Sequence, residues 1–226
     1  MKYLFHYQDF KLNNLILTVI ILISISTQSS WAAYNLEVKG GYESWKTSLY
    51  GNANAVVGGV GVAYYKDRYF AGGGLVLGDY ALDDEDGKSI SRKDLDLVLG
   101  YKLDSQWSLY SGYRFNRTNY VSNTSASLDR RENTLGLGIG ASFNVVLAQS
   151  WIGFGTVSIS GIYSYNNADD KGKGYSAGSE GGILYSINPK TTVAVRVKYQ
   201  TNKIDYDPGE WSHSYIRFGA HLGYLF

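Results

Sequence analysis

Residues 216–226 read Ile-Arg-Phe-Gly-Ala-His-Leu-Gly-Tyr-Leu-Phe, and this stretch decides the fold. Every second residue, from Ile216 to Phe226, is apolar. The residues between them are Arg217, Gly219, His221, Gly223 and Leu225. Because successive residues of a β-strand point to opposite faces of a sheet, the pattern predicts a strand. One face of this strand suits hydrocarbon, and the other, apart from Leu225, suits water.

The same alternation recurs along the chain and predicts ten strands, most of them 9–11 residues long, which is the length of a tilted membrane crossing. They are Leu36–Trp45, Ala55–Tyr65, Tyr69–Asp79, Lys93–Tyr101, Trp107–Arg117, Arg131–Phe143, Trp151–Tyr165, Tyr175–Tyr185, Thr191–Gln200 and Ile216–Phe226. Eight strands are the alternative if a weak segment, such as the second or the seventh, is miscounted.

The connections between these segments alternate in length. Those at 66–68, 102–106, 144–150 and 187–190 are short, whereas four others are longer and polar. The longer ones are Tyr80–Arg92, Thr118–Arg130, Asn166–Gly174 and Thr201–His213. Short periplasmic turns and longer extracellular loops are typical of outer-membrane proteins. The pattern predicts an all-β fold, a closed antiparallel transmembrane β-barrel.

The amino terminus has the layout of a secretory signal peptide. Lys2 and Lys11 make a basic start, a strongly apolar run of about eleven residues follows, and Ser30-Trp31-Ala32 supplies small residues for cleavage. The competing interpretation is a membrane-anchoring helix, which needs about 20 apolar residues. We therefore predict a signal peptide at residues 1–32, cut after Ala32, and a barrel domain at residues 33–226.

Composition excludes several classes of function. The chain has 27 Gly, 21 Tyr, two Pro and no Cys, so disulfides, thiol catalysis and cysteine metal sites are ruled out. Without residues 1–32 it carries 19 basic and 19 acidic residues, and no basic excess indicates nucleic acid. The glycines at 136, 138 and 140 lie on one strand face without a following helix, so they do not predict a nucleotide loop. We predict neither metal nor cofactor.

The alternation, the aromatic residues beside the connections and the terminal Phe226 together resemble small bacterial outer-membrane barrels of the porin-like superfamily, the Opa, OmpX and OmpW type. A soluble β-barrel or sandwich with an aromatic core is the alternative. The resemblance implies residence in the outer membrane, with outer-membrane lipid and lipopolysaccharide around the barrel. It also implies that the barrel-assembly machinery recognises the last strand.

Charged residues on the polar faces of the strands are expected to line the lumen and to pair, since unpaired buried ions are costly. They are Glu37, Lys39, Glu43, Asp94, Asp96, Arg114, Glu132, Glu180, Arg196, Lys198 and Arg217, with His221 beside them. We predict the pairs Asp94–Arg114, Glu180 with Arg196 or Lys198, and Glu43–Arg217. The lumen should then be mostly plugged, or at most a narrow water path.

The sequence favours a non-enzymatic barrel that acts in surface interaction, envelope integrity or limited passage of small solutes. Loops on a rigid scaffold usually carry contacts, so Tyr120, Tyr206 and Trp211 are predicted as exposed contact residues for an extracellular ligand or host surface.

The alternative function is an outer-membrane barrel enzyme with its site at the extracellular rim. An omptin-like protease would use acidic residues and a histidine on facing loops, for which the nearest candidates are Asp83, Asp84, Asp205, Asp207 and His213. A lipid A-modifying enzyme would use His213 and Ser214. The acidic run at residues 83–86 is interpreted as a solvated loop tip, and a divalent cation site is the alternative.

Overall fold

The computed structural model of this protein describes residues 32–48, 51–82, 88–122, 130–167, 170–206 and 209–226. These residues form ten β-strands, and none of them belongs to a helix that could cross a membrane. The strands are β1 (Ala32–Thr47), β2 (Gly51–Lys66), β3 (Tyr69–Leu82), β4 (Lys88–Lys102), β5 (Trp107–Ser122), β6 (Arg130–Ala148), β7 (Trp151–Asn166), β8 (Lys171–Asn188), β9 (Thr191–Tyr206) and β10 (Gly209–Leu225).

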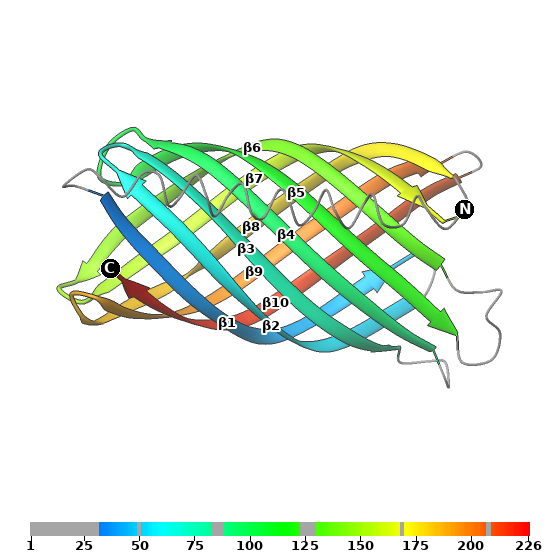
Figure 1. Cartoon of the computed structure of the whole chain (residues 1–226), viewed down its shortest axis with the longest axis horizontal. Coiled ribbons are helices and arrows are strands. Elements are labelled where there is room, and N and C mark those ends of the chain that lie inside the picture. The colour runs from blue at the N-terminus through cyan, green and yellow to red at the C-terminus, as the bar shows by residue number, and fades with distance from the viewer. Residues whose placement is uncertain (1–31, 49–50, 83–87, 123–129, 168–169, 207–208) are drawn as a thin grey trace.

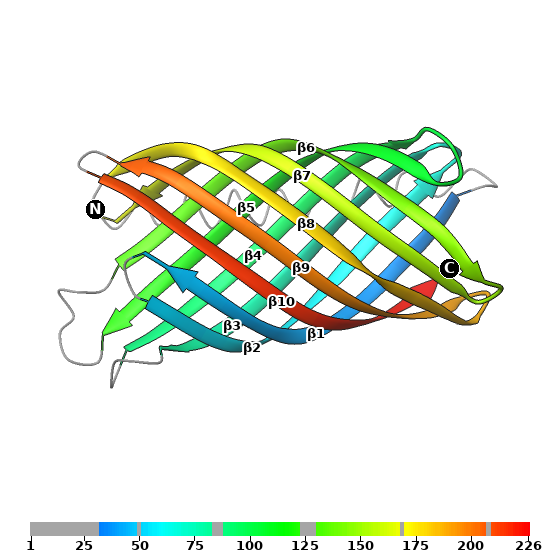
Figure 2. The same ribbon diagram turned by 180° about the vertical axis from the view of Figure 1, so that it is seen from behind.

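Each strand pairs antiparallel with its sequence neighbours, and β1 pairs with β10 to close the barrel (Figures 1 and 2). The predicted closed barrel of ten strands is confirmed. The predicted signal peptide lies outside the described residues except for Ala32. Its prediction therefore stays a prediction.

The two ends of the barrel differ. The turn end holds the short connections at 67–68, 103–106, 149–150 and 189–190, together with the start of β1 and the carboxyl terminus. There the backbone N–H of Phe226 donates to the carbonyl oxygen of Tyr34 at 2.8 Å. The loop end holds the other five connections. Both described chain ends therefore lie at the turn end, as an even number of strands requires.

The strands are 14–19 residues long, so the connections at the loop end are shorter than the predicted spans, and those predicted bounds were wrong. β3 continues to Leu82 and β5 to Ser122, within the predicted loops Tyr80–Arg92 and Thr118–Arg130. Likewise, β8 begins at Lys171 and β9 ends at Tyr206. Toward the loop end the outward residues become polar, so the apolar alternation disappears while the backbone ladder continues.

An apolar belt surrounds the part of the wall nearer the turn end. Outward side chains such as Val56, Leu137 and Ile139 are exposed, Leu137 by 71 %. Aromatic rings mark the edge of the belt at the turn end as neighbouring pairs across strands: Tyr69–Tyr101, Trp107–Phe143 and Trp151–Tyr185, with centroids 5.2, 5.7 and 4.6 Å apart. Such a girdle is expected where a barrel meets lipid headgroups.

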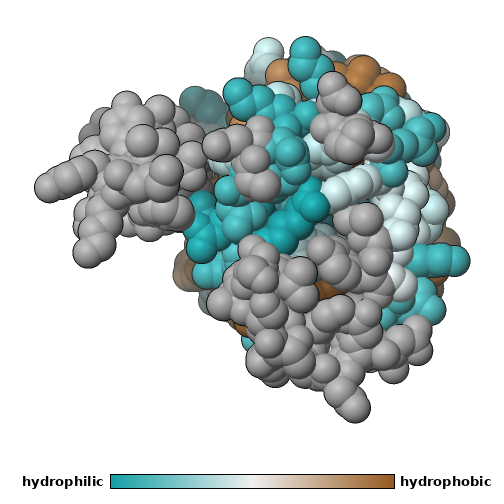
Figure 3. All heavy atoms as spheres, turned by 90° about the vertical axis from the view of Figure 1, so that its right-hand side faces the viewer, coloured by the Kyte–Doolittle hydropathy of each residue, from teal (hydrophilic) through white to brown (hydrophobic). Residues whose placement is uncertain are grey.

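Above the belt, the outward face toward the loop end is polar, and we call this zone the collar. Figure 3 looks onto the loop end, where the described residues are largely hydrophilic while hydrophobic residues lie along the wall. Among the described residues the charged members of the collar are Lys46, Asp79, Lys93, Arg117, Arg131, Lys171, Lys173, Lys203, Asp205 and Glu210. Basic residues outnumber acidic ones here.

One glycine of β6, Gly140, leaves space for the aromatic ring of Tyr110 on the neighbouring strand. A Cβ added to Gly140 would overlap the phenol of Tyr110, which crosses β6 to donate to the carbonyl oxygen of Val157 on β7 at 3.3 Å. Overpacking at such a site is destabilising. This position of the column at 136, 138 and 140 therefore seats an aromatic side chain.

Candidate functional site

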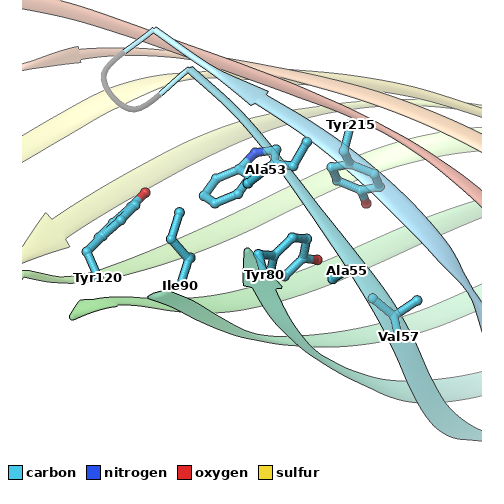
Figure 4. Close-up of a cluster of buried hydrophobic side chains, with 8 residues drawn as sticks. Ala53, Ala55, Val57, Tyr80, Ile90, Tyr120 and Tyr215 are labelled. Carbon is cyan, nitrogen blue, oxygen red and sulfur yellow. The ribbon is translucent and has the colours of Figure 1, made fainter. Parts of the chain in front are cut away.

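The lumen toward the loop end is filled by packed apolar side chains, which we call the aromatic plug (Figure 4). Trp45 lies between Tyr80 and Tyr120, with ring centroids 5.6 and 6.2 Å away. Trp45 and Ile90 are each only 1 % exposed. The plug consists of Trp45, Ala53, Ala55, Val57, Tyr80, Ile90, Tyr120 and Tyr215.

A group of four charged residues lies against the plug, and we call it the ion network. Glu43 accepts hydrogen bonds from the Tyr80 hydroxyl at 2.7 Å and from Nε of Arg217 at 2.6 Å. Asp94 accepts from Nε of Arg92 at 2.8 Å and from Nη2 of Arg217 at 3.2 Å. Two carboxylates thus meet two guanidinium groups, and the network is neutral.

The guanidinium group of Arg92 also lies over the rings of Trp45 and Tyr215, 5.5 and 4.8 Å from their centroids. Cations are attracted to aromatic faces, most strongly where water is excluded. Arg92 therefore ties the ion network to the aromatic plug, and the two form one packed unit.

A second closed group occupies the β6–β9 side of the lumen. Glu132 accepts hydrogen bonds from the hydroxyls of Ser164 and Tyr206, both at 3.1 Å. Tyr206 packs against Trp211 with the rings tilted, and Arg130 lies over Trp211 at 3.6 Å from its centroid. These side chains close the lumen beside the plug.

Tyr120 and Tyr206, two of the three predicted contact residues, are buried, so the prediction that they are exposed was wrong. Tyr120 belongs to the plug and Tyr206 to the Glu132 group, with 8 % and 7 % of their surfaces exposed. Trp211 is partly buried against Tyr206. Because β5 and β9 extend to the loop end, these aromatic residues occupy inward strand positions rather than loop tips.

The predicted ion pairs have mixed outcomes. Arg217 binds Glu43, and Nη1 of Arg196 binds Glu180 at 3.1 Å. The pair Asp94–Arg114 was wrong, because Arg114 lies opposite Asp96 and bonds to it, whereas Asp94 lies opposite Asn116. Lys102 faces Ser108, so the turn is centred on Ser105, and moving its centre by one residue moves every partner by two.

The part of the lumen toward the turn end is more open and carries most of the predicted lining residues. Two adjoining cavities of about 230 and 380 Å³ lie there. Their charged and titratable lining residues are Glu37, Lys39, Asp96, Arg114, Glu180, Arg196, Lys198, Arg217 and His221. The remaining three predicted residues, Glu43, Asp94 and Glu132, are buried nearer the loop end.

Sequence reasoning missed three polar residues of the lumen. Arg92 and Arg130 lie just outside the predicted fourth and sixth strands. Gln200 accepts hydrogen bonds from Arg114 and from the Tyr215 hydroxyl, and its amide nitrogen donates to Ser176. Arg92 shares the parity of Asp94 and Asp96, so extending the fourth strand by one residue would have identified it.

The described residues do not assemble the predicted enzymatic sites. His213 points into the lumen, packs edge-on against Trp45 and is 2.6 Å from Asn202. Asp205 is exposed on the opposite face of the wall, as is the side of β10 that carries Ser214. Asp83, Asp84, Asp207 and the acidic run at 83–86 lie outside the described residues. Among the described residues no cluster of three potential metal ligands occurs.

No protein-family model matches this chain, and no curated protein matches its sequence. Solved structures do resemble it. The outer membrane protease OmpT from Escherichia coli aligns with a TM-score of 0.51 and 10% identity, over 89% of this chain and 99% of that one. The β domain of the Bordetella autotransporter BrkA aligns with a TM-score of 0.50 and 11% identity, over 87% and 99%.

This protein has the outer-membrane β-barrel fold. Neisserial surface protein A also aligns, with a TM-score of 0.42 and 11% identity over 84% of this chain and 97% of that one. The resemblance to OmpT and BrkA concerns the fold alone, because proteins of one fold at identities near 10% can have different functions. An outer-membrane barrel must therefore be assigned a function from its own residues.

Proposed function

We propose that this protein is a bacterial outer-membrane barrel that does not conduct solutes and serves envelope integrity and contact at the cell surface. The observation that carries the proposal is the filled lumen toward the loop end. Large side chains are buried there, including Trp45, Glu43 and Gln200, each exposed by 1 % or less. A barrel of about eight strands is just filled by its own side chains, and here bulky aromatic residues fill ten.

Planar-bilayer recording tests this proposal. The purified barrel should give no steady conductance above that of the empty bilayer. As a control, a variant with Trp45→Ala, Tyr80→Ala and Tyr120→Ala removes three rings of the plug and should show channel events if it folds. Stable openings in the wild-type protein would contradict the closed barrel.

The collar supports lipopolysaccharide as the partner around the barrel. Lys93 lies directly opposite Arg117 across β4 and β5, and Arg131 follows on β6. Lys93 and Arg117 point outward two residues above the apolar Leu95 and Phe115, and Arg131 points outward four residues above Leu135. We place lipid phosphates at this level. Cationic side chains with several donors suit phosphate groups.

A binding measurement tests this partner. Lys93→Gln, Arg117→Gln and Arg131→Gln combined should lower the lipid A phosphate retained by the purified barrel. The matched control is Arg68→Gln, Lys102→Gln and Lys190→Gln, which removes three basic residues at the turn end. Equal losses from both triple variants would show that charge alone, and not the collar, determines retention.

Export through a cleaved signal peptide belongs to the same proposal. Protein recovered from the outer membrane should begin at Ala33 when its amino terminus is analysed by mass spectrometry. Recovery of an intact amino terminus from the inner membrane would contradict both the cleavage and the location.

A further inference from the structure

The two cavities toward the turn end form one chamber. They share five lining residues, Asp96, Val98, Glu180, Arg196 and Lys198. The larger cavity, about 380 Å³, falls within the range of small-molecule pockets. The chamber is therefore large enough for a small ligand with its water.

The charges of the chamber do not balance. Arg217 also lines it, but that residue is neutralised within the ion network by Glu43 and Asp94. What remains is four cations, Lys39, Arg114, Arg196 and Lys198, against three carboxylates, Glu37, Asp96 and Glu180. The described lining thus carries an excess of one positive charge, which favours an anion.

Two buried nitrogens of residues that line the chamber have no hydrogen-bond partner among the described residues: Nε of Arg196, which is a donor, and Nδ1 of His221, which faces Glu37 and is a donor when protonated. The other nitrogens of Arg196 are held by Glu180 at 3.1 Å and Glu37 at 3.3 Å, which fixes the guanidinium plane. Nδ1 of His221 is 3.7 Å from Glu37, too far for a hydrogen bond. Buried donors without an acceptor are unfavourable, so an acceptor is expected here.

Hydroxyl groups line the larger cavity together with Arg196 and Lys198. β7 turns Thr156, Ser158 and Ser160 inward at successive lumenal positions, and Ser142 of β6 lies opposite Thr156. Hydroxyls can donate to the oxygens of an anion or accept from bound water. Gly72 and Gly74 of β3 line the smaller, adjoining cavity, where the absence of a side chain leaves space.

The chamber is accessible to water. The side chains of Asp96 and Lys39 are 36 % and 22 % exposed, although both point into the lumen, whereas Glu43 is fully buried beside the plug. Because the plug closes the lumen toward the loop end, entry to the chamber is from the turn end.

We propose that this chamber binds a small oxyanion of the size of phosphate, which enters from the turn end and is held by Arg196, His221 and Lys198. The site is independent of what the collar contacts and of whether the barrel conducts.

Thiol labelling tests the site, because the chain has no native cysteine. Ser158→Cys places a thiol in the chamber, and Ser105→Cys places one in an exposed turn at the same end. Each is reacted in detergent with anionic sulfonatoethyl and cationic trimethylammonioethyl methanethiosulfonate. The ratio of anionic to cationic rates should be about tenfold higher at Ser158→Cys, because a charged cleft concentrates opposite charge.

Inorganic phosphate at constant ionic strength should slow labelling at Ser158→Cys and leave Ser105→Cys unchanged. Adding Arg196→Gln, or separately Lys39→Gln, should lower the rate ratio and weaken the protection. Two variants are used so that poor folding of one does not decide the result. Equal rate ratios at the two sites, or no protection by phosphate, would show that water alone occupies the chamber and would overturn the proposal.

Discussion

Glu43 shows how much one buried carboxylate contributes to the stability of this barrel. It is fully buried, and its carboxylate is bonded to Tyr80 and Arg217 and is 3.8 Å from Arg92. Removal of one partner from a buried ion pair leaves the other charge uncompensated. The position is therefore a sensitive test of the ion network.

Glu43→Ala should lower the free energy of unfolding by about 3–5 kcal/mol, because Arg217 and Arg92 lose their shared acceptor. Equilibrium unfolding of the refolded protein in urea, followed by tryptophan fluorescence, measures the change. Glu210→Ala is the control, since Glu210 bonds only to exposed Lys203 among the contacts of the described residues and should change stability by less than about 1 kcal/mol. Equal effects of the two variants would contradict a buried network.

For single charged residues, the sequence predicted the face of the strand better than the ion-pair partner, and the reason is physical. The face on which each charged residue lies follows from parity within a strand, so Glu43 and Arg217 could be placed in the lumen. The partner of each depends on the register, and the register depends on the turn. Because the turn is centred on Ser105 rather than on Asp104, the partner of Arg114 is Asp96 and not the predicted Asp94.

At the scale of the element, each strand has two zones, and only one of them shows the apolar–polar alternation that identifies a strand in the sequence. In the belt, outward residues are apolar and inward ones polar, so β6 is recognisable from Leu135 to Phe143. Above the belt both faces carry polar residues, and the inward face also carries Tyr80 of β3 and Tyr206 of β9. The ends of the strands at the loop end therefore could not be predicted from alternation.

The belt and the collar should respond differently to a charge on the outer wall. Ile139→Arg places a cation in the middle of the belt and should destabilise the barrel by about 2–4 kcal/mol in phospholipid vesicles. Ser44→Arg places the same side chain in the collar, where the cost should be about 0–1 kcal/mol. Unfolding in urea from vesicles gives both values. A similar cost at both positions would mean that the lipid boundary lies elsewhere.

From the turn between β4 and β5 we predict that the stability of the barrel depends on pH through Asp104. The carboxylate of Asp104 accepts the backbone N–H groups of Gln106 and Trp107, both at 2.7 Å, and these bonds lower the pKa of Asp104. Since the pKa is lower in the folded state, the contribution of Asp104 to stability is present above its ordinary value of about 3.9. It is lost as the pH falls through the lowered pKa.

Asp104→Ala should therefore reduce stability at pH 7, and its difference from wild type should shrink at the acidic end. Urea midpoints measured between pH 7 and pH 2.5 test this, with Ser105→Ala as the control in the same turn. A difference that stays constant with pH would show that the ionised carboxylate is not the group that holds the turn.

At the scale of the whole molecule, the fold was predictable because the alternation within each strand and the number of strands can both be read from short segments of the sequence. Ten alternating segments with an even count bring both chain ends to one side, and β1 then pairs with β10 from Asn35–Leu225 to Thr47–His213. The contents of the lumen were not predictable in the same way. They depend on which of ten inward faces meet across the barrel, and alternation along one strand does not carry that information.

Phe226, beside the pairing of β1 with β10, allows an effect on assembly in cells to be distinguished from an effect on the stability of the folded barrel. Phe226 is 61 % exposed, and its side chain contacts Tyr224 with centroids 4.8 Å apart. Its backbone bond to Tyr34 does not depend on the side chain. Phe226→Ala should therefore change the stability of protein refolded in vitro only slightly. In cells it should lower the amount of folded barrel in the outer membrane several-fold if the assembly machinery recognises the terminal aromatic ring.

Tyr69→Ala is the matched control, because Tyr69 is an aromatic residue at the same end with 66 % of its surface exposed. It should leave assembly in cells near the wild-type amount. Quantitative blots of heated and unheated outer-membrane fractions give the folded amounts, and urea unfolding gives the stabilities. If Phe226→Ala and Tyr69→Ala reduced assembly equally, the terminal ring would be one more member of the aromatic girdle rather than a recognition signal.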